Sequence, residues 1–144
     1  MTDPADTPEI RSWEDVAALL DGHTDDEVTS AVTELGTDET IAQIADVMVE
    51  WLRNARSGIP DAIVQCDITA PEGIHTFHLT IADGTFATDP GPGHAPTVSL
   101  ELALADFLRL VTGRLNGLEA FLSGTLKLSG DLILGQQMQS WFTV

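Results

Sequence analysis

Basic residues are scarce in this 144-residue chain: six lysines and arginines stand against 23 acidic residues, which gives a net charge of −17. Binding to nucleic acid phosphates needs a continuous basic surface, and six scattered cations are too few to form one. An anionic membrane surface repels such a chain for the same reason. We therefore expect no nucleic acid partner and no stable membrane insertion.

Long apolar runs and secretory features are also missing. Nowhere do 18 apolar residues follow one another, and the first ten residues, MTDPADTPEI, have neither a basic nor an apolar segment. The single cysteine, Cys66, cannot form an internal disulfide and lies in a strand-like run, which favours a buried apolar side chain over a reactive thiol. These features are typical of a cytoplasmic protein, and we expect that localisation.

Familiar catalytic and metal-binding motifs are absent. The sequence has no nucleophile elbow, no phosphate-binding loop, no HExxH helix and no tyrosine. His75 and His78 lie three residues apart in a predicted strand, so they face opposite sides of a sheet and cannot share a metal ion. Among 23 carboxylates, chance acidic pairs are inevitable. We expect no enzyme activity, no metal and no cofactor.

The N-terminal part of the chain has the apolar spacing of helices. One apolar stripe ends before Gly22, a second follows a capping box made by Thr24 and Glu27, and a third extends to Leu52. These helices are acidic, because residues 1–58 hold 14 acids and three bases. The acidic surface offers a docking site for a basic protein partner, and the net charge favours a monomer.

After Asp61 the apolar period changes from 3.6 to 2, which indicates β-strands. A turn at residues 71–73 separates the first two strands, and Asp83 with Gly84 marks a tight hairpin into a third. These signals predict a three-strand antiparallel meander with one apolar face.

The proline- and glycine-rich residues 89–96 predict a crossover loop. A short fourth strand follows, then a helical stripe from Leu104 to Leu115 that Gly113 interrupts, a turn at Asn116, a fifth strand over residues 124–130 and a last helix. The pattern therefore predicts five strands together with several helices. The large apolar side chains of the last 44 residues suit either a packed core or a ligand cavity, and periodicity leaves both open.

Two C-terminal motifs resemble those of a known family. Residues 106–113 read DFLRLVTG, residues 120–131 read AFLSGTLKLSGD, and Met138 lies near the end of the chain. In this order they resemble the C-terminal signature of sterol carrier protein type-2 domains. The resemblance covers about residues 38–144, with Thr125 in place of the lysine usual in the strand motif.

This resemblance implies an α+β fold with a five-stranded sheet covered on one face by helices. It further implies an apolar tunnel between sheet and helices that holds a fatty acid, a fatty acyl-CoA, a sterol or another lipid, without covalent chemistry. It also implies a lipid-binding domain over residues 38–144, preceded by an acidic helical N-terminal extension at residues 1–37. The candidate lipid-binding residues that it carries over are Phe107, Leu108, Val111, Phe121, Leu122, Leu134, Met138 and Trp141. From the apolar pattern we add a facing wall of Trp51, Val64, Phe77 and Leu79.

Three function hypotheses follow. The favoured one is binding or intracellular transfer of a hydrophobic small molecule. A second is a non-catalytic interaction or regulatory protein, with a collapsed tunnel, that binds a partner through its acidic helices. A third is an enzyme for a hydrophobic substrate. The sequence does not identify the ligand, because all these lipids share the same favourable burial of apolar area.

Overall fold

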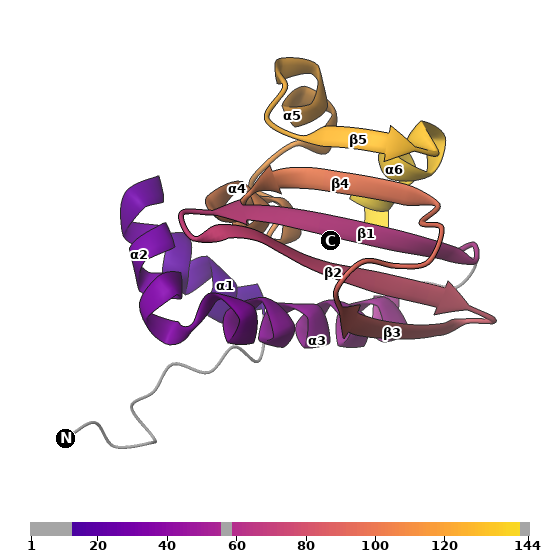
Figure 1. The fold of residues 1–144 in the computed structure, drawn as a ribbon, viewed down its shortest axis with the longest axis horizontal. Helices are drawn as coiled ribbons and strands as arrows, with labels where there is room; N and C mark the ends of the chain where they lie inside the picture. The colour runs from indigo at the N-terminus through magenta and orange to yellow at the C-terminus, as the bar shows by residue number, and fades with distance from the viewer. Residues whose placement is uncertain (1–12, 56–58, 142–144) are drawn as a thin grey trace.

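The computed structural model describes residues 13–55 and 59–141, which form a five-stranded sheet with helices packed on one face (Figure 1). The helices are α1 (Trp13–Leu20), α2 (Asp25–Leu35), α3 (Thr37–Ala55), α4 (Leu104–Val111), α5 (Gly117–Ser123) and α6 (Leu132–Trp141). The strands are β1 (Ala62–Ala70), β2 (Gly73–Ala82), β3 (Thr85–Pro90), β4 (Val98–Ala103) and β5 (Lys127–Gly130).

The sheet has the strand order β3-β2-β1-β4-β5. Strands β1, β2 and β3 form an antiparallel meander, β4 then pairs parallel with β1, and β5 pairs antiparallel with β4. The predicted α+β fold, with a meander, a crossover and two further strands, is therefore confirmed. The hairpin between β2 and β3 has positive φ at both central residues, 51° at Asp83 and 75° at Gly84, as a type I′ turn requires.

Alternation along the strands decides which face the helices cover. In β1, the side chains of Val64, Cys66 and Ile68 are all buried, and the residues between them are only partly covered. Phe77 and Leu79 continue the buried face in β2. Because side chains alternate between the two faces of a strand, this pattern gives the sheet one apolar face.

The crossover from β3 to β4 passes over the opposite face of the sheet. There the Gly93 amide donates to Gln65 Oε1 at 3.2 Å, and His78 Nδ1 lies 2.9 Å from the Gly91 carbonyl oxygen. A Cβ on Gly93 would lie 2.6 Å from Ile63 Cγ2. Glycine at this position therefore lets the loop lie against the sheet and brings β4 beside β1.

The N-terminal helices pack into the same core as the sheet. Val16 of α1 and Val28 and Val32 of α2 are fully buried in it. The predicted capping box of α2 is present: the Glu27 amide donates to Thr24 Oγ1 at 3.2 Å, and the Thr24 amide donates to Glu27 Oε1 at 2.9 Å. Local capping thus sets where α2 begins, and burial of its apolar stripe holds it in place.

Element ends in the C-terminal part differ from the sequence predictions. Helix α4 ends at Val111, just before the interruption predicted at Gly113, and Asn116, predicted as part of a turn, is the N-cap of α5, where its side chain accepts from the Glu119 amide at 3.0 Å. Strand β5 begins at Lys127 instead of residue 124, because Gly124 adopts a left-handed conformation that ends α5. β3 extends to Pro90, which an edge strand tolerates.

A histidine links the meander to α3. His75 Nδ1 lies 2.5 Å from Asp38 Oδ1 in the first turn of α3, and His75 Nε2 lies 2.9 Å from Glu72 Oε1. The hydrogen bond to Asp38 raises the pKa of His75, against the opposing effect of its burial. A hydrogen bond from Thr37 is the largest cause that lowers the pKa of Glu72, and His75 adds to it.

We predict that this link is pH-dependent. A raised pKa in the folded state stabilises the protein fully below the unfolded histidine pKa of about 6.5, and the contribution is lost as pH rises through the folded value. In urea unfolding, His75→Gln should therefore lower the free energy of unfolding at pH 6 and have much less effect at pH 9. If His75→Gln lowers the free energy of unfolding at pH 9 by as much as at pH 6, or by more, the prediction is contradicted.

Candidate functional site

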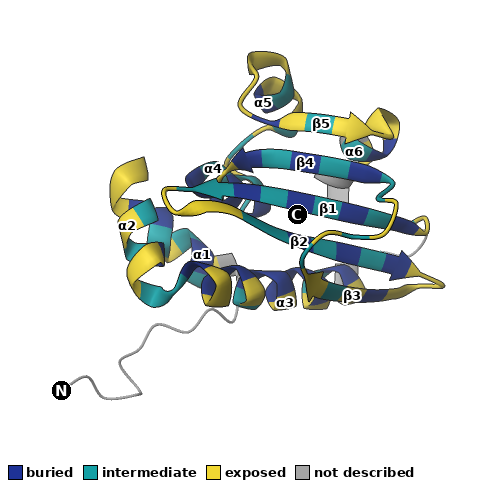
Figure 2. Ribbon diagram, viewed as in Figure 1, coloured by how far each residue is buried: buried dark blue, intermediate teal, exposed yellow. Residues whose placement is uncertain are grey.

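A cavity of about 690 Å³ lies between the apolar face of the sheet and the helices behind it. All strands except the edge strand β3 contribute to its wall. The side chains of this strand wall are Val64, Cys66, Leu79, Leu100 and Leu128, and Leu126, which comes just before β5, adds to them. Burial is extensive in β1, β2 and β4 and falls at β5 and α5 (Figure 2). The covering of the sheet is therefore weakest at the β5 edge.

Helices supply the facing wall. Phe107, Leu110 and Val111 of α4 line the cavity, with Phe121 of α5 and Met48 of α3. The ring of Phe107 meets that of Phe77 edge to face, with centroids 5.9 Å apart and an interplanar angle of 69°. Aromatic pairs prefer this arrangement, and it fixes one end of α4 against β2.

One end of the cavity is polar and open. Arg114 and Asn116 from the connection between α4 and α5 line it, together with Glu119 of α5. The exposed side chains of Leu118 and Leu132 lie on the same rim. We call this opening the mouth. The cavity therefore combines an apolar interior with a cation, an amide and a carboxylate at its entrance.

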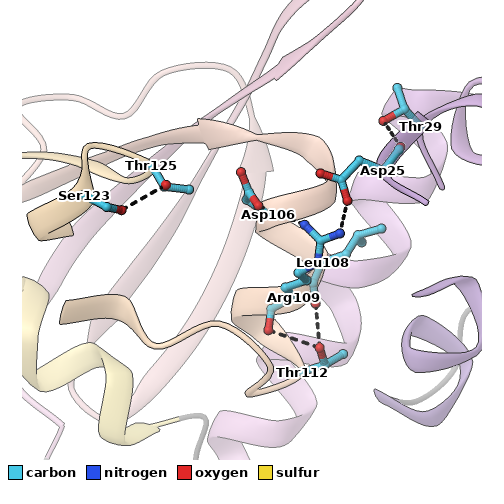
Figure 3. Close-up of polar contacts among 8 residues, drawn as sticks. All are labelled: Asp25, Thr29, Asp106, Leu108, Arg109, Thr112, Ser123 and Thr125. Atoms are coloured by element: carbon cyan, nitrogen blue, oxygen red, sulfur yellow. Dashed lines mark hydrogen bonds and ion pairs between the residues drawn. The ribbon is translucent and has the colours of Figure 1, made fainter. Parts of the chain in front are cut away.

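Ion pairs hold the N-terminal helices against the other side of this wall. Arg109 of α4 pairs with Asp106 at 3.0 Å and with Asp25 of α2 (Figure 3). At the mouth, Arg114 Nη1 lies 2.6 Å from Asp21 Oδ1, just after α1. Arg109 and Arg114 thus connect the cavity's helical wall to the acidic N-terminal helices.

Side-chain hydroxyl groups donate hydrogen bonds to backbone carbonyl oxygens where α4 and α5 end. Thr112 Oγ1 donates to the Leu108 carbonyl oxygen at 2.8 Å, and Ser123 Oγ donates to the Ala120 carbonyl oxygen at 3.1 Å. Ser123 Oγ also lies 3.1 Å from Thr125 Oγ1 (Figure 3). These contacts help to fix the two ends of the segment that carries the mouth.

The structure brings together five of the twelve sequence-predicted site residues. Those that line the cavity are Val64, Leu79, Phe107, Val111 and Phe121. Phe77, Leu108 and Leu134 are buried in the surrounding core, and Trp51 packs half-buried against it.

For the remaining three predicted residues, the structure shows neither a cavity position nor a core position. Leu122 is 74% exposed and lies outside it, because one residue along a helix is a rotation of about 100° from Phe121. Met138 and Trp141 belong to α6, but their side chains lie outside the described ones. Lipid contact by the twelve residues stays a prediction.

Several lining residues were not among those predictions. Cys66 and Leu100 share the buried face of the sheet, so strand alternation carried the signal for them. Arg114, Asn116 and Glu119 fall in a loop or at a helix start, where no periodicity exists. Their place at the mouth depends on the tertiary fold.

Cys66 combines a cavity position with chemical inertness. Its side chain is 3% exposed, which confirms the predicted burial. Burial, together with the neighbouring charge of Asp67, raises the pKa of the thiol to about 12. At neutral pH the sulfur is therefore protonated and forms part of the apolar wall.

Metal-binding clusters and membrane-spanning helices are both absent from residues 13–55 and 59–141. In that part of the chain, no group of three or more His, Cys, Asp or Glu side chains is arranged to hold a metal ion. None of its helices is long and apolar enough to cross a membrane.

We predict that Cys66 resists alkylation in the folded protein. With a thiol pKa near 12, the thiolate fraction at pH 8 falls by about a thousandfold relative to an ordinary cysteine. Alkylation by iodoacetamide, followed by mass spectrometry, should be at least that much slower in buffer than in concentrated urea. Rates within tenfold of each other contradict the buried position.

Comparison with solved structures shows the fold in other proteins. The crystal structure of Sterol Carrier Protein 2 Like 2 from Aedes aegypti matches 73% of this chain and 98% of its own, with 19% identity and a TM-score of 0.59. The solution structure of palmitated SCP2L2 from the same species matches 70% and 92%, with 18% identity and a TM-score of 0.58.

The fold also occurs within a larger enzyme. A mutant of the sec-alkyl sulfatase PisA1 matches 72% of this chain but only 16% of its own, with 16% identity and a TM-score of 0.58. At these identities the structural likeness establishes the fold alone. In sequence, the model of the SCP-2 sterol transfer family matches residues 41–143. The chain therefore belongs to the SCP-2 sterol transfer family.

Proposed function

We propose that this protein binds a single-chain lipid in the cavity and carries it between membranes inside the cell. Family membership supports lipid binding and transfer in general. The observation that carries the specific proposal is the 690 Å³ cavity with its apolar wall of strand and helix side chains. Small-molecule sites commonly have volumes of about 300–1,000 Å³ and are mostly apolar.

Burial of an acyl chain is sufficient for useful affinity. Each methylene removed from water contributes about 0.8 kcal/mol, so a chain of about 15 carbons gains on the order of 10 kcal/mol. Micromolar binding corresponds to about 8 kcal/mol. The surplus offsets part of the loss of translational and conformational freedom, and no strong polar contact is needed.

The mouth favours a lipid with an anionic head group. Arg114 is the one cation among the described lining residues, and its partner Asp21 is 65% exposed. A ligand carboxylate can replace this exposed partner at little cost, because surface ion pairs are weak. The palmitated neighbour supports a fatty acid as the ligand class. We propose that the carboxylate lies at the mouth and the acyl chain in the apolar interior.

The same geometry offers little for catalysis. The thiol in the cavity wall has a pKa of about 12, so it is a poor nucleophile at neutral pH. Glu119 is exposed at the rim, away from the apolar interior. The proposal therefore contains no covalent step.

Two neighbouring residues of α5 test cavity binding. Phe121 lines the cavity and Leu122 is exposed outside it, so Phe121→Asp places a charge in the site while Leu122→Asp is a matched control. We predict that Phe121→Asp weakens binding of a soluble fluorescent fatty acid by at least tenfold, because an unpaired charge is costly in an apolar site. Leu122→Asp should leave the dissociation constant within twofold. Equal effects, or no binding by the delipidated wild type, contradict cavity binding.

Arg114 tests the orientation of the ligand. We predict that Arg114→Gln weakens binding of a fatty acid several-fold and leaves binding of the fatty alcohol of the same length unchanged, because only the acid forms a charge-assisted contact. Arg109→Gln is the control, since Arg109 pairs with Asp25 and Asp106 but does not line the cavity. Calorimetric titration of each variant and the wild type with both ligands measures these affinities. If Arg114→Gln loses the same affinity for the acid and for the alcohol, the head group does not contact Arg114.

A further inference from the structure

Exposed large apolar side chains gather next to the mouth of the cavity. Five such residues are exposed in the described chain: Ile74, Leu118, Leu122, Leu132 and Ile133. All except Ile74 lie on α5 or in the first turn of α6, which contact each other. We call these four the apolar rim. Leu118 and Leu132 also line the cavity, so the rim is continuous with the apolar interior.

The segment that carries the apolar rim has no net charge, in contrast to the rest of the chain. Residues 102–144 contain three acids and three bases and are therefore neutral overall, and residues 1–101 carry the whole net charge of −17. The acidic helices α1 and α2 lie on the other side of α4 from the sheet edge that β5 and α5 form (Figure 1). Negative charge is therefore low around the mouth, where Glu119 is one acid and Asp21 is paired with Arg114.

We propose that the apolar rim docks the mouth onto a bilayer surface of zwitterionic lipid. This inference rests on the proposed function, because a lipid that leaves a membrane for the cavity has to avoid water on the way. Apolar side chains that enter the boundary between head groups and acyl chains make a continuous apolar path to the cavity. A surface without excess negative charge is suited to zwitterionic head groups.

The size of the rim favours a bilayer over a protein partner. Stable protein interfaces use about 20–30 residues on each side, with a larger apolar centre than four side chains supply. Two copies of a chain with charge −17 also repel each other. Reversible contact with a membrane needs only a few inserted side chains, and a carrier has to dissociate after each transfer.

The test uses two exposed positions of the rim and one matched position away from it. Leu122 is 74% and Ile133 71% exposed, and the control residue, Ile74, is 63% exposed at the start of β2, away from the cavity lining. The double variant Leu122→Glu with Ile133→Glu is compared with Ile74→Glu and the wild type. Each substitution changes an exposed side chain, so all three proteins should fold, which circular dichroism checks.

Binding is measured by flotation with phosphatidylcholine vesicles and, separately, with a soluble fluorescent fatty acid. We expect the double variant to lose vesicle binding by about tenfold or more, because two apolar contacts with lipid are removed. The Ile74→Glu protein should bind vesicles as the wild type does. All three proteins should bind the soluble fatty acid equally. Replacing a third of the phosphatidylcholine with phosphatidylserine at low salt should weaken binding of the wild type.

Several results overturn the docking proposal. These are equal vesicle binding by wild type and double variant, equal loss in the Ile74→Glu control, or a concentration-dependent dimer of the wild type that the double variant does not form. The last result assigns the rim to a second copy of the chain. If instead the wild type binds vesicles through the rim but does not bind the soluble fatty acid, the proposed function fails and the docking surface stands.

Discussion

The apolar face of the sheet has to be shielded from water, and the helices cover this face unevenly. α3 packs against β3 and α4 against β1 and β4, and Val64, Leu79 and Phe107 are almost fully buried. Each such side chain contributes about 1.5–3 kcal/mol on burial. Towards β5 the cover thins, and the space between strand and helix becomes the cavity. The site is thus a consequence of how the core is closed.

A cavity of this size bears on stability. An enclosed, empty void costs about 24 cal/mol per Å³, so 690 Å³ would cost roughly 15 kcal/mol. That matches the whole stability of a typical domain, about 5–15 kcal/mol. The open mouth admits solvent or ligand, which prevents a cost of this size. On the proposed function, an acyl chain would restore the lost contacts of the wall, and ligand binding would then stabilise the fold.

Much of the fold could be predicted because its signals are local. The alternation of Val64, Cys66 and Ile68 indicates a strand with one buried face, and the capping box of Thr24 and Glu27 places the start of a helix. The site was less predictable. Periodicity shows that Phe121 and Leu122 point in different directions, but which of them faces the sheet depends on how the short helix α5 packs. The pair of Arg114 with Asp21 joins residues far apart in the chain, and only the tertiary fold brings them together.

The central claim is that the acyl chain of a lipid lies between sheet and helices. It is tested most directly by NMR of methyl-labelled protein with palmitic acid, through nuclear Overhauser effects between ligand and protein methyl groups. The account predicts effects from the acyl chain to the methyl groups of Val64, Leu79 and Val111, which line the cavity, and none to Ile74. Effects confined to exposed methyl groups, with none at the three cavity residues, would contradict it.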